Sequence, residues 1–84
     1  SLSGYVSRAC RVVGESGLPF TFTPMGTIFE AGSVKEALDI IRRAHEALFE
    51  AGASRVSTSI KIDDRRDKGR QMRDKVSALK LERG

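Results

Sequence analysis

The sequence of 84 residues is poor in cysteine, histidine and tryptophan. It has no tryptophan, one cysteine and one histidine. A single cysteine excludes an internal disulfide and a cluster of thiolate ligands. Cys10 falls on an apolar helical stripe, so we expect a reduced, buried thiol, which suits the cytoplasm. No second histidine or cysteine accompanies His45 at metal-ligand spacing, which argues against a metal site.

Long hydrophobic runs and an excess of one charge are also missing. No run approaches the ~18 apolar residues of a membrane span, and no leader precedes a cleavage site, so we expect a soluble protein that is not exported and has no membrane partner. Fifteen Lys and Arg stand against eleven Asp and Glu, and the two signs are interleaved. Nucleic-acid binders present an unopposed basic face. A nucleic-acid partner is therefore not expected.

The length and the periodicity together predict one small domain over residues 1–84, with a single thin core that oligomerisation commonly supplements. Apolar spacing predicts a first helix from Leu2 that ends near Gly17. Two antiparallel strands follow, over about 19–24 and 26–31, separated by a Pro-Met-Gly turn. A capping box of Ser33 and Glu36 opens a second helix, which Gly52 ends.

Two further elements complete the predicted order. The segment 55–63 alternates in hydrophobicity, so we expect a strand with Val56, Thr58, Ile60 and Ile62 facing the helices. From about residue 67, helical spacing of Met72, Val76 and Leu79 predicts a terminal helix.

This order corresponds to an α+β, ferredoxin-like sandwich, the β-α-β-β-α-β plan, without its first strand and with an extra C-terminal helix. In that plan the spatial strand order is 4-1-3-2, so the missing strand lies between two others. The strand over 55–63 would then have no neighbour, and its backbone groups would lack partners. We expect either residues before Ser1 or a partner chain to fill the gap.

Three motifs carry a family resemblance. They are "TPMGTIFEAG" at Thr23–Gly32, "AHEALFEAGASRV" at Ala44–Val56 and "IKIDDRRDK" at Ile60–Lys68. With their order and spacing, they make the chain similar to the small thiamine-binding protein family from about Gly4 to Val76, although family members begin with a strand that is absent here. The resemblance implies a ferredoxin-like fold, a homodimer that assembles into tetramers through sheet faces, and binding of thiamine or its hydroxymethylpyrimidine moiety without known catalysis.

A thiamine site needs an apolar wall, partners for the ring edge and preferably a carboxylate. Glu30, at a strand end, is our leading ligand residue; the alternative is a solvent-facing acid. Thr23 and Thr27 bracket the Pro-Met-Gly turn and would hydrogen-bond the pyrimidine edge, or they are ordinary strand residues. Met25 and Phe29 would supply the apolar wall, or they belong to the core.

A second group of candidates lies on the predicted strand over 55–63 and beside it. Ser57 and Ser59 face away from the helices beside Lys61, so this polar face stacks on another subunit, lines an interfacial pocket or meets water. His45 is interpreted as a partly buried, hydrogen-bonded histidine, with a role in the site as the alternative through the family's "AHEA" motif.

Six charged residues in a row, 63–68, follow that strand. Arginine forks of Arg65 and Arg66 pair well with carboxylates such as those of Asp63 and Asp64. Exposed ion pairs add little to stability, so we expect these pairs to act in specificity instead. They would fix the direction in which the chain leaves the sheet and the alignment of one subunit with another. A solvated loop, or a Mg²⁺ site at Asp63 and Asp64, are the alternatives.

Three classes of function remain open. The first is a non-catalytic binder of thiamine or a related pyrimidine, which needs no cofactor. The second is a regulatory or assembly module that binds another small metabolite at a subunit interface. The third is an enzyme of the same fold class, which is the least favoured, because no set of nucleophile, base and orienting group can be assembled.

Overall fold

The second helix shows how local signals set the bounds of an element. In the computed structural model, which describes residues 2–66 and 79–82, α2 spans Val34–Glu50. The Ser33 hydroxyl accepts a hydrogen bond from the Glu36 amide at 3.1 Å, and Oε1 of Glu36 accepts one from the Gly32 amide at 2.7 Å. Both bonds satisfy donors near the helix start, so the predicted capping pair is confirmed. Gly52, at φ +109°, follows the helix end as predicted.

The first helix and the hairpin also follow the sequence pattern. Helix α1 spans Leu2–Glu15 and is followed by Gly17 at φ +80°, a left-handed conformation that favours glycine. Strands β1 (Phe20–Thr23) and β2 (Gly26–Phe29) pair antiparallel. The two predicted strands are therefore confirmed, each with slightly shorter bounds.

The last strand corrects the prediction of a terminal helix. Strand β3 spans Ser57–Ile60, and β4 spans Leu79–Glu82, where the sequence predicted helix. The four strands form one antiparallel sheet in the order β1-β2-β4-β3. The two other residues of the predicted helical stripe, Met72 and Val76, lie outside the described residues.

Strand β4 occupies the position that the predicted plan gives to its missing first strand. It pairs with β3 over four residues, from Ser57 opposite Glu82 to Ile60 opposite Leu79, and with β2 where Thr27 lies opposite Leu79. A later segment of this same chain therefore fills the gap, whereas we expected residues before Ser1 or a partner chain to fill it. Backbone partners for β2 and β3 outweigh the helical spacing of a few apolar side chains.

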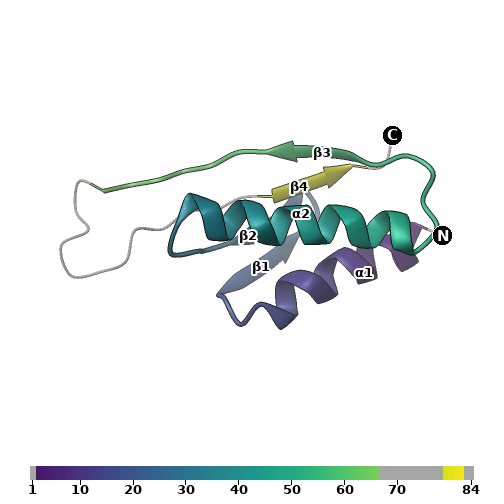
Figure 1. The fold of residues 1–84 in the computed structure, drawn as a ribbon, viewed down its shortest axis with the longest axis horizontal. Helices are drawn as coiled ribbons and strands as arrows, with labels where there is room; N and C mark the ends of the chain where they lie inside the picture. The colour runs from purple at the N-terminus through teal and green to yellow at the C-terminus, as the bar shows by residue number, and fades with distance from the viewer. Residues whose placement is uncertain (1, 67–78, 83–84) are drawn as a thin grey trace.

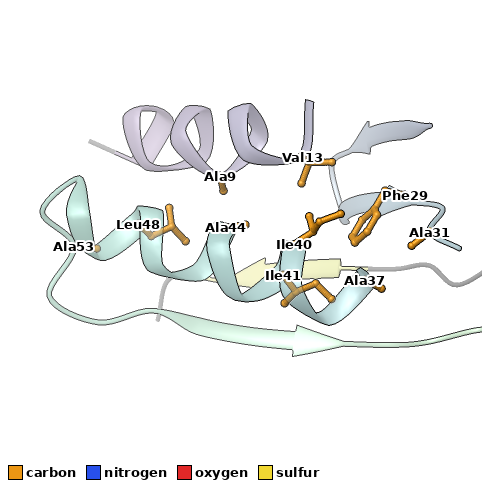
Figure 2. Packing of buried hydrophobic residues seen from close by; sticks show 10 residues of the cluster. All are labelled: Ala9, Val13, Phe29, Ala31, Ala37, Ile40, Ile41, Ala44, Leu48 and Ala53. Carbon is orange, nitrogen blue, oxygen red and sulfur yellow. The ribbon is translucent and has the colours of Figure 1, made fainter. Parts of the chain in front are cut away.

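Both helices pack against one face of the sheet and against each other (Figure 1). Between these layers lies the core, seen in Figure 2, with the side chains of α1 and α2 pointing toward one another. Half of its members are alanine, which lets the backbones approach closely. The buried set comprises Ala9, Val13, Phe29, Ala31, Ala37, Ile40, Ile41, Ala44, Leu48 and Ala53.

The edge strand β3 is only partly covered. Thr58 contacts α2 through His45, and Val56 packs against the core, as the alternation predicted. Ile60 and Ile62 have the same alternation, yet they remain 45% and 38% exposed. After β3 the chain runs on in an extended course past the start of α2 (Figure 1). Because β3 is an edge strand, no further strand lies beside it. Its helix-side residues are therefore less completely buried than those of a central strand.

Candidate functional site

The predicted ligand residues of the hairpin turn belong to the turn itself. Oγ1 of Thr23 donates to the carbonyl oxygen of Gly26 at 2.8 Å and accepts from the Met25 amide at 3.1 Å. These bonds fix the turn between β1 and β2. Met25 lies at its tip and is 72% exposed, so within one chain it forms no wall.

Two other candidates, Thr27 of β2 and Glu30 just after it, lie on opposite faces of the sheet, because side chains alternate along a strand. Thr27 lies opposite Phe22 and has the same alternation as the buried Phe29, so its side chain is on the helix side and is half-buried. Glu30 follows the strand, with the opposite alternation, and is also half-buried. Its amide donates to the carbonyl oxygen of Pro19 at 3.0 Å, which holds this end of β2 against the start of β1. Phe29 is fully buried and belongs to the core.

The serines of β3 face away from the helices. Thr58, between them, forms a hydrogen bond with His45 of α2, so Ser57 and Ser59 project from the other side of the sheet. Ser57 is half-buried and Ser59 is exposed.

We call this other side the outer face and define it by the residues that β1, β2 and β3 place there. They are Thr21, Thr23, Ile28, Ser57 and Ser59, and the register of β4 adds Lys80 opposite Ser59 and Glu82 opposite Ser57. Thr21 lies opposite Ile28, and Ile28, an apolar side chain, is 47% exposed. The sequence analysis missed Thr21 and Ile28, although the alternation around Phe29 contained the signal for Ile28. The outer face combines the apolar Ile28 with threonine and serine residues and with the charged residues Lys80 and Glu82 of β4, and it is not covered by α1 or α2 (Figure 1).

His45 has a structural partner. Its Nδ1 lies 2.6 Å from Oγ1 of Thr58, and its ring centroid lies 5.5 Å from that of Phe49. This agrees with the interpretation of a hydrogen-bonded, half-buried histidine. It lies on the helix side of the sheet, away from Ser57 and Ser59.

In the described part of the charged run, residues 63–66, Arg66 and Asp64 form an ion pair. Nε and Nη2 of Arg66 donate to the two carboxylate oxygens of Asp64 at 3.1 and 2.8 Å, a bidentate contact. The hydrogen bond with Arg66 lowers the pKa of Asp64. Lys61, Asp63 and Arg65 are exposed. In the described part of the chain no group of three or more metal-ligating side chains occurs, and Asp64 is already paired, which does not favour the Mg²⁺ alternative.

A shallow depression lies on the solvent side of α2, and none of the predicted ligand residues lines it. Its walls come from one helix and its N-terminal cap: Gly32, Ser33, Lys35, Glu36, Leu38, Asp39 and Arg42. The exposed pair of Arg42 and Asp39, 2.8 Å apart, crosses it. Because none of the predicted ligand residues lines this depression, whereas Ser57 and Ser59 lie on the outer face, we take the outer face as the candidate site.

The fold is that of a small α+β domain with two helices on one face of an antiparallel sheet. Residues 1–80 match the model of the family described as "Thiamine-binding protein", and the chain belongs to this family. No solved structure is significantly similar to the chain.

Curated relatives of the chain include several UPF0045 proteins. The one from Methanothermobacter thermautotrophicus is 42% identical over 80 residues, which is 95% of this chain and 81% of the relative. YqgV of Bacillus subtilis is 35% identical over 83 residues, covering 94% of this chain and 79% of the relative. A relative from Staphylococcus xylosus is 45% identical over 62 residues, which is 74% of this chain and 57% of the relative. Within the described residues, neither helix is long and apolar enough to cross a membrane.

Proposed function

We propose that the protein binds thiamine, or its hydroxymethylpyrimidine moiety, at the outer face and does not transform it. Membership of the thiamine-binding protein family supports a small-molecule ligand. The observation that carries the proposal is the exposed Ile28, 47% accessible, on a sheet face that also carries the hydroxyl residues Thr21, Ser57 and Ser59. A heteroaromatic ring needs such an apolar seat, with few polar groups around it.

The hydroxyls suit the edge of an aminopyrimidine. Ser57 and Ser59 offer both donors and acceptors, as the ring nitrogens and the exocyclic amino group require. Ile28 and Ser59 lie on strands separated by β4, so about 10 Å of sheet surface lies between them. A molecule with two linked rings laid across β4 would reach both.

Glu30 supplies the carboxylate in this proposal. By alternation with Ile28 it lies at the end of the outer face, half-buried. A carboxylate there accepts from the amino group of the pyrimidine or opposes the cationic thiazolium. Thr23, Thr27 and Met25 take no direct part within one chain, because Thr23 and Met25 form the turn and Thr27 lies on the helix side.

A second copy of the chain would complete the site. One flat face encloses a ligand from one side only, whereas small-molecule sites bury most of the ligand. Covering the outer face with the same face of another copy buries Ile28 and adds to the thin core of an 84-residue chain. A homodimer, or a dimer of dimers, follows from this proposal.

Calorimetric titration with thiamine, hydroxymethylpyrimidine and thiamine phosphates tests the function. We expect binding of thiamine and of the pyrimidine fragment, and none of the thiazole fragment alone. Glu30→Gln should weaken binding about 10-fold or more, since a charge-assisted hydrogen bond is lost. The matched control is Glu46→Gln, an exposed glutamate on α2, which should bind as the unmodified protein does.

The same titration separates the alternatives. If no pyrimidine ligand binds at millimolar concentration, the function as an assembly module for another metabolite replaces this one. If Glu30→Gln retains full affinity, the ligand assignment of Glu30 is wrong and the outer face must be tested through Ser59.

A further inference from the structure

We infer that the outer face carries a phosphate subsite at Ser59, between Lys61 and Lys80, and that the preferred ligand is a phosphate ester of thiamine. The inference rests on the proposed function for the rings of the ligand and adds the charged group at one end of it. Beyond Ile60 the chain stays extended (Figure 1), so alternation places Ser59 and Lys61 on the same face, and both are exposed. The register sets Lys80 of β4 directly opposite Ser59.

The spacing of these three positions suits a single phosphate group. Directly opposed positions on neighbouring strands lie about 5 Å apart, and positions two residues apart on one strand lie about 7 Å apart. A lysine ends in an ammonium group on a flexible four-carbon stem, so lysines at both positions reach a phosphate that lies over the hydroxyl of Ser59. Two ammonium groups and one hydroxyl then donate to the phosphate oxygens.

The neighbour of Lys80 in β2 leaves room for the ligand. Thr27 lies opposite Leu79, so one step along this antiparallel pair Gly26 lies opposite Lys80. Gly26 has the same alternation as Ile28 and occupies a position on the outer face without a side chain. A ligand laid across β4 therefore meets no bulky neighbour of Lys80 on that side.

Carboxylates bound this subsite on both sides. Glu82 lies one outer-face position beyond Lys80, on the side away from Lys61. Asp63 and Glu30 lie toward the opposite end of the face, by alternation with Lys61 and Ile28. The two lysine positions thus occupy the middle of the face. An anionic group is attracted there, whereas amino and cationic groups are attracted to the ends.

A thiamine phosphate has its polar groups in a matching order. The aminopyrimidine is at one end, and the phosphate ester at the other carries between one and two negative charges at neutral pH. With the pyrimidine over Ile28 and its amino group at Glu30, the phosphate end reaches Ser59, about 10 Å away across β4. In this orientation Ser59 serves the phosphate, and the hydroxyl of Thr21, opposite Ile28, serves the ring edge.

The same charges disfavour the unphosphorylated compound. Thiamine brings only its thiazolium cation near Lys61 and Lys80, and like charges repel one another. The phosphate ester reverses the sign of this interaction at the end of the ligand that lies over Ser59. The outer face therefore distinguishes two forms of one ligand by charge.

Calorimetric titration at low salt is the first test. Thiamine monophosphate should bind about tenfold or more tightly than thiamine, and about 0.5 M salt should reduce the difference, because it screens exposed charges. Lys61→Gln and Lys80→Gln should each remove most of this preference without weakening the binding of thiamine. Lys80→Arg keeps the charge and should keep the preference, which separates loss of charge from damage to β4. The matched control is Lys35→Gln, on the solvent side of α2, which should behave as the unmodified protein does.

An NMR titration with inorganic phosphate distinguishes the ester from phosphate alone. Inorganic phosphate at millimolar concentration should shift the amide signals of Ser59 and Lys61 and leave that of Lys35 in place. It should bind far more weakly than thiamine monophosphate, because the rings add their own contacts at Ile28. Equal affinities would show that the rings contribute nothing and that the assignment of an ester is wrong.

The failure of this inference differs from the failure of the proposed function. If the unmodified protein binds thiamine and thiamine monophosphate equally well, the phosphate subsite is wrong and the proposed function stands. The subsite is also wrong if Lys61→Gln and Lys80→Gln both keep the preference for the ester. If neither compound binds, the proposed function fails, and the assignment of its phosphorylated form fails with it.

Discussion

Nδ1 of His45 lies 2.6 Å from Oγ1 of Thr58, and this hydrogen bond joins the middle of α2 to the edge strand β3. It is the side-chain bond that fixes which face of β3 meets the helix. By alternation it therefore also directs Ser57 and Ser59 to the outer face. The only histidine of the sequence thus acts on the candidate site indirectly, by orienting the strand that carries it.

Removing the Thr58 hydroxyl should weaken this junction. Thr58→Val keeps the shape of the side chain and leaves Nδ1 of His45 without its partner. We expect the free energy of unfolding to fall by about 1 kcal/mol, the usual net contribution of such a bond. Urea unfolding followed by circular dichroism measures it. Thr21→Val, on the exposed outer face, is the control, and equal losses in the two variants would show that the bond contributes nothing specific.

Phe29 is the largest fully buried side chain of the core. It is fully buried, whereas Phe22 on the neighbouring strand is 45% exposed. Phe29→Ala should lower the free energy of unfolding by about 3–5 kcal/mol, because a large cavity forms. A domain of this kind has only about 5–15 kcal/mol in total, so extensive unfolding near room temperature is expected. Phe22→Ala should cost clearly less in the same thermal denaturation; the reverse order would refute this packing.

The ion pair on α2 should be visible in a pH titration. The hydrogen bond from Arg42 lowers the pKa of Asp39. A lowered folded-state pKa means that the pair stabilises the fold at neutral pH and that this contribution is lost as the pH falls through the pKa of Asp39. Both side chains are more than half exposed, so the effect on stability is small.

Arg42→Gln should therefore raise the pKa of Asp39 toward its ordinary value and scarcely move the unfolding midpoint. Carboxyl carbon shifts in NMR report the titration directly. Arg66→Gln is the control: it should raise the pKa of Asp64 and leave Asp39 unchanged. An Asp39 that titrates identically with and without Arg42 would contradict the geometry.

Cys10 should react slowly. It is half-buried on α1, and burial raises the pKa of its thiol. Because the thiolate is the nucleophile, we expect slow reaction with a disulfide reagent at neutral pH and much faster reaction in denaturant. Ser7→Cys in a C10S background places a thiol at an exposed position of the same helix and should label quickly. Equal rates for Cys10 in the folded and unfolded states would show that α1 does not shield it.

Local signals predicted the elements that local interactions determine. Ser33 and Glu36 cap α2 as expected, and the alternation of Phe20 and Phe22 marks a strand. The residues Leu79–Glu82 were predicted as helix because helical spacing is a local pattern, whereas their strand pairing with β2 and β3 depends on partners about 20 to 50 positions away in the chain.

The candidate site was predicted only in part, for a similar reason. Ser57 and Ser59 were assigned to the correct face, because alternation is sufficient for a strand whose helix side is known. Thr23 was predicted to contact a ligand, yet its hydroxyl is used by the turn, a bond that residue type alone does not reveal. Ile28 could have been found from its alternation with Phe29, whereas the position of Thr21 beside it depends on the register of β1 against β2.

The most direct test of the central claim is an NMR titration of the isotopically labelled protein with thiamine. If the ligand lies on the outer face, the amide signals of Thr21, Ile28, Ser57 and Ser59 should shift most, while those of Lys35 and Asp39 on the solvent side of α2 should stay in place. Shifts concentrated on α2, or no shifts at millimolar thiamine, would contradict the account.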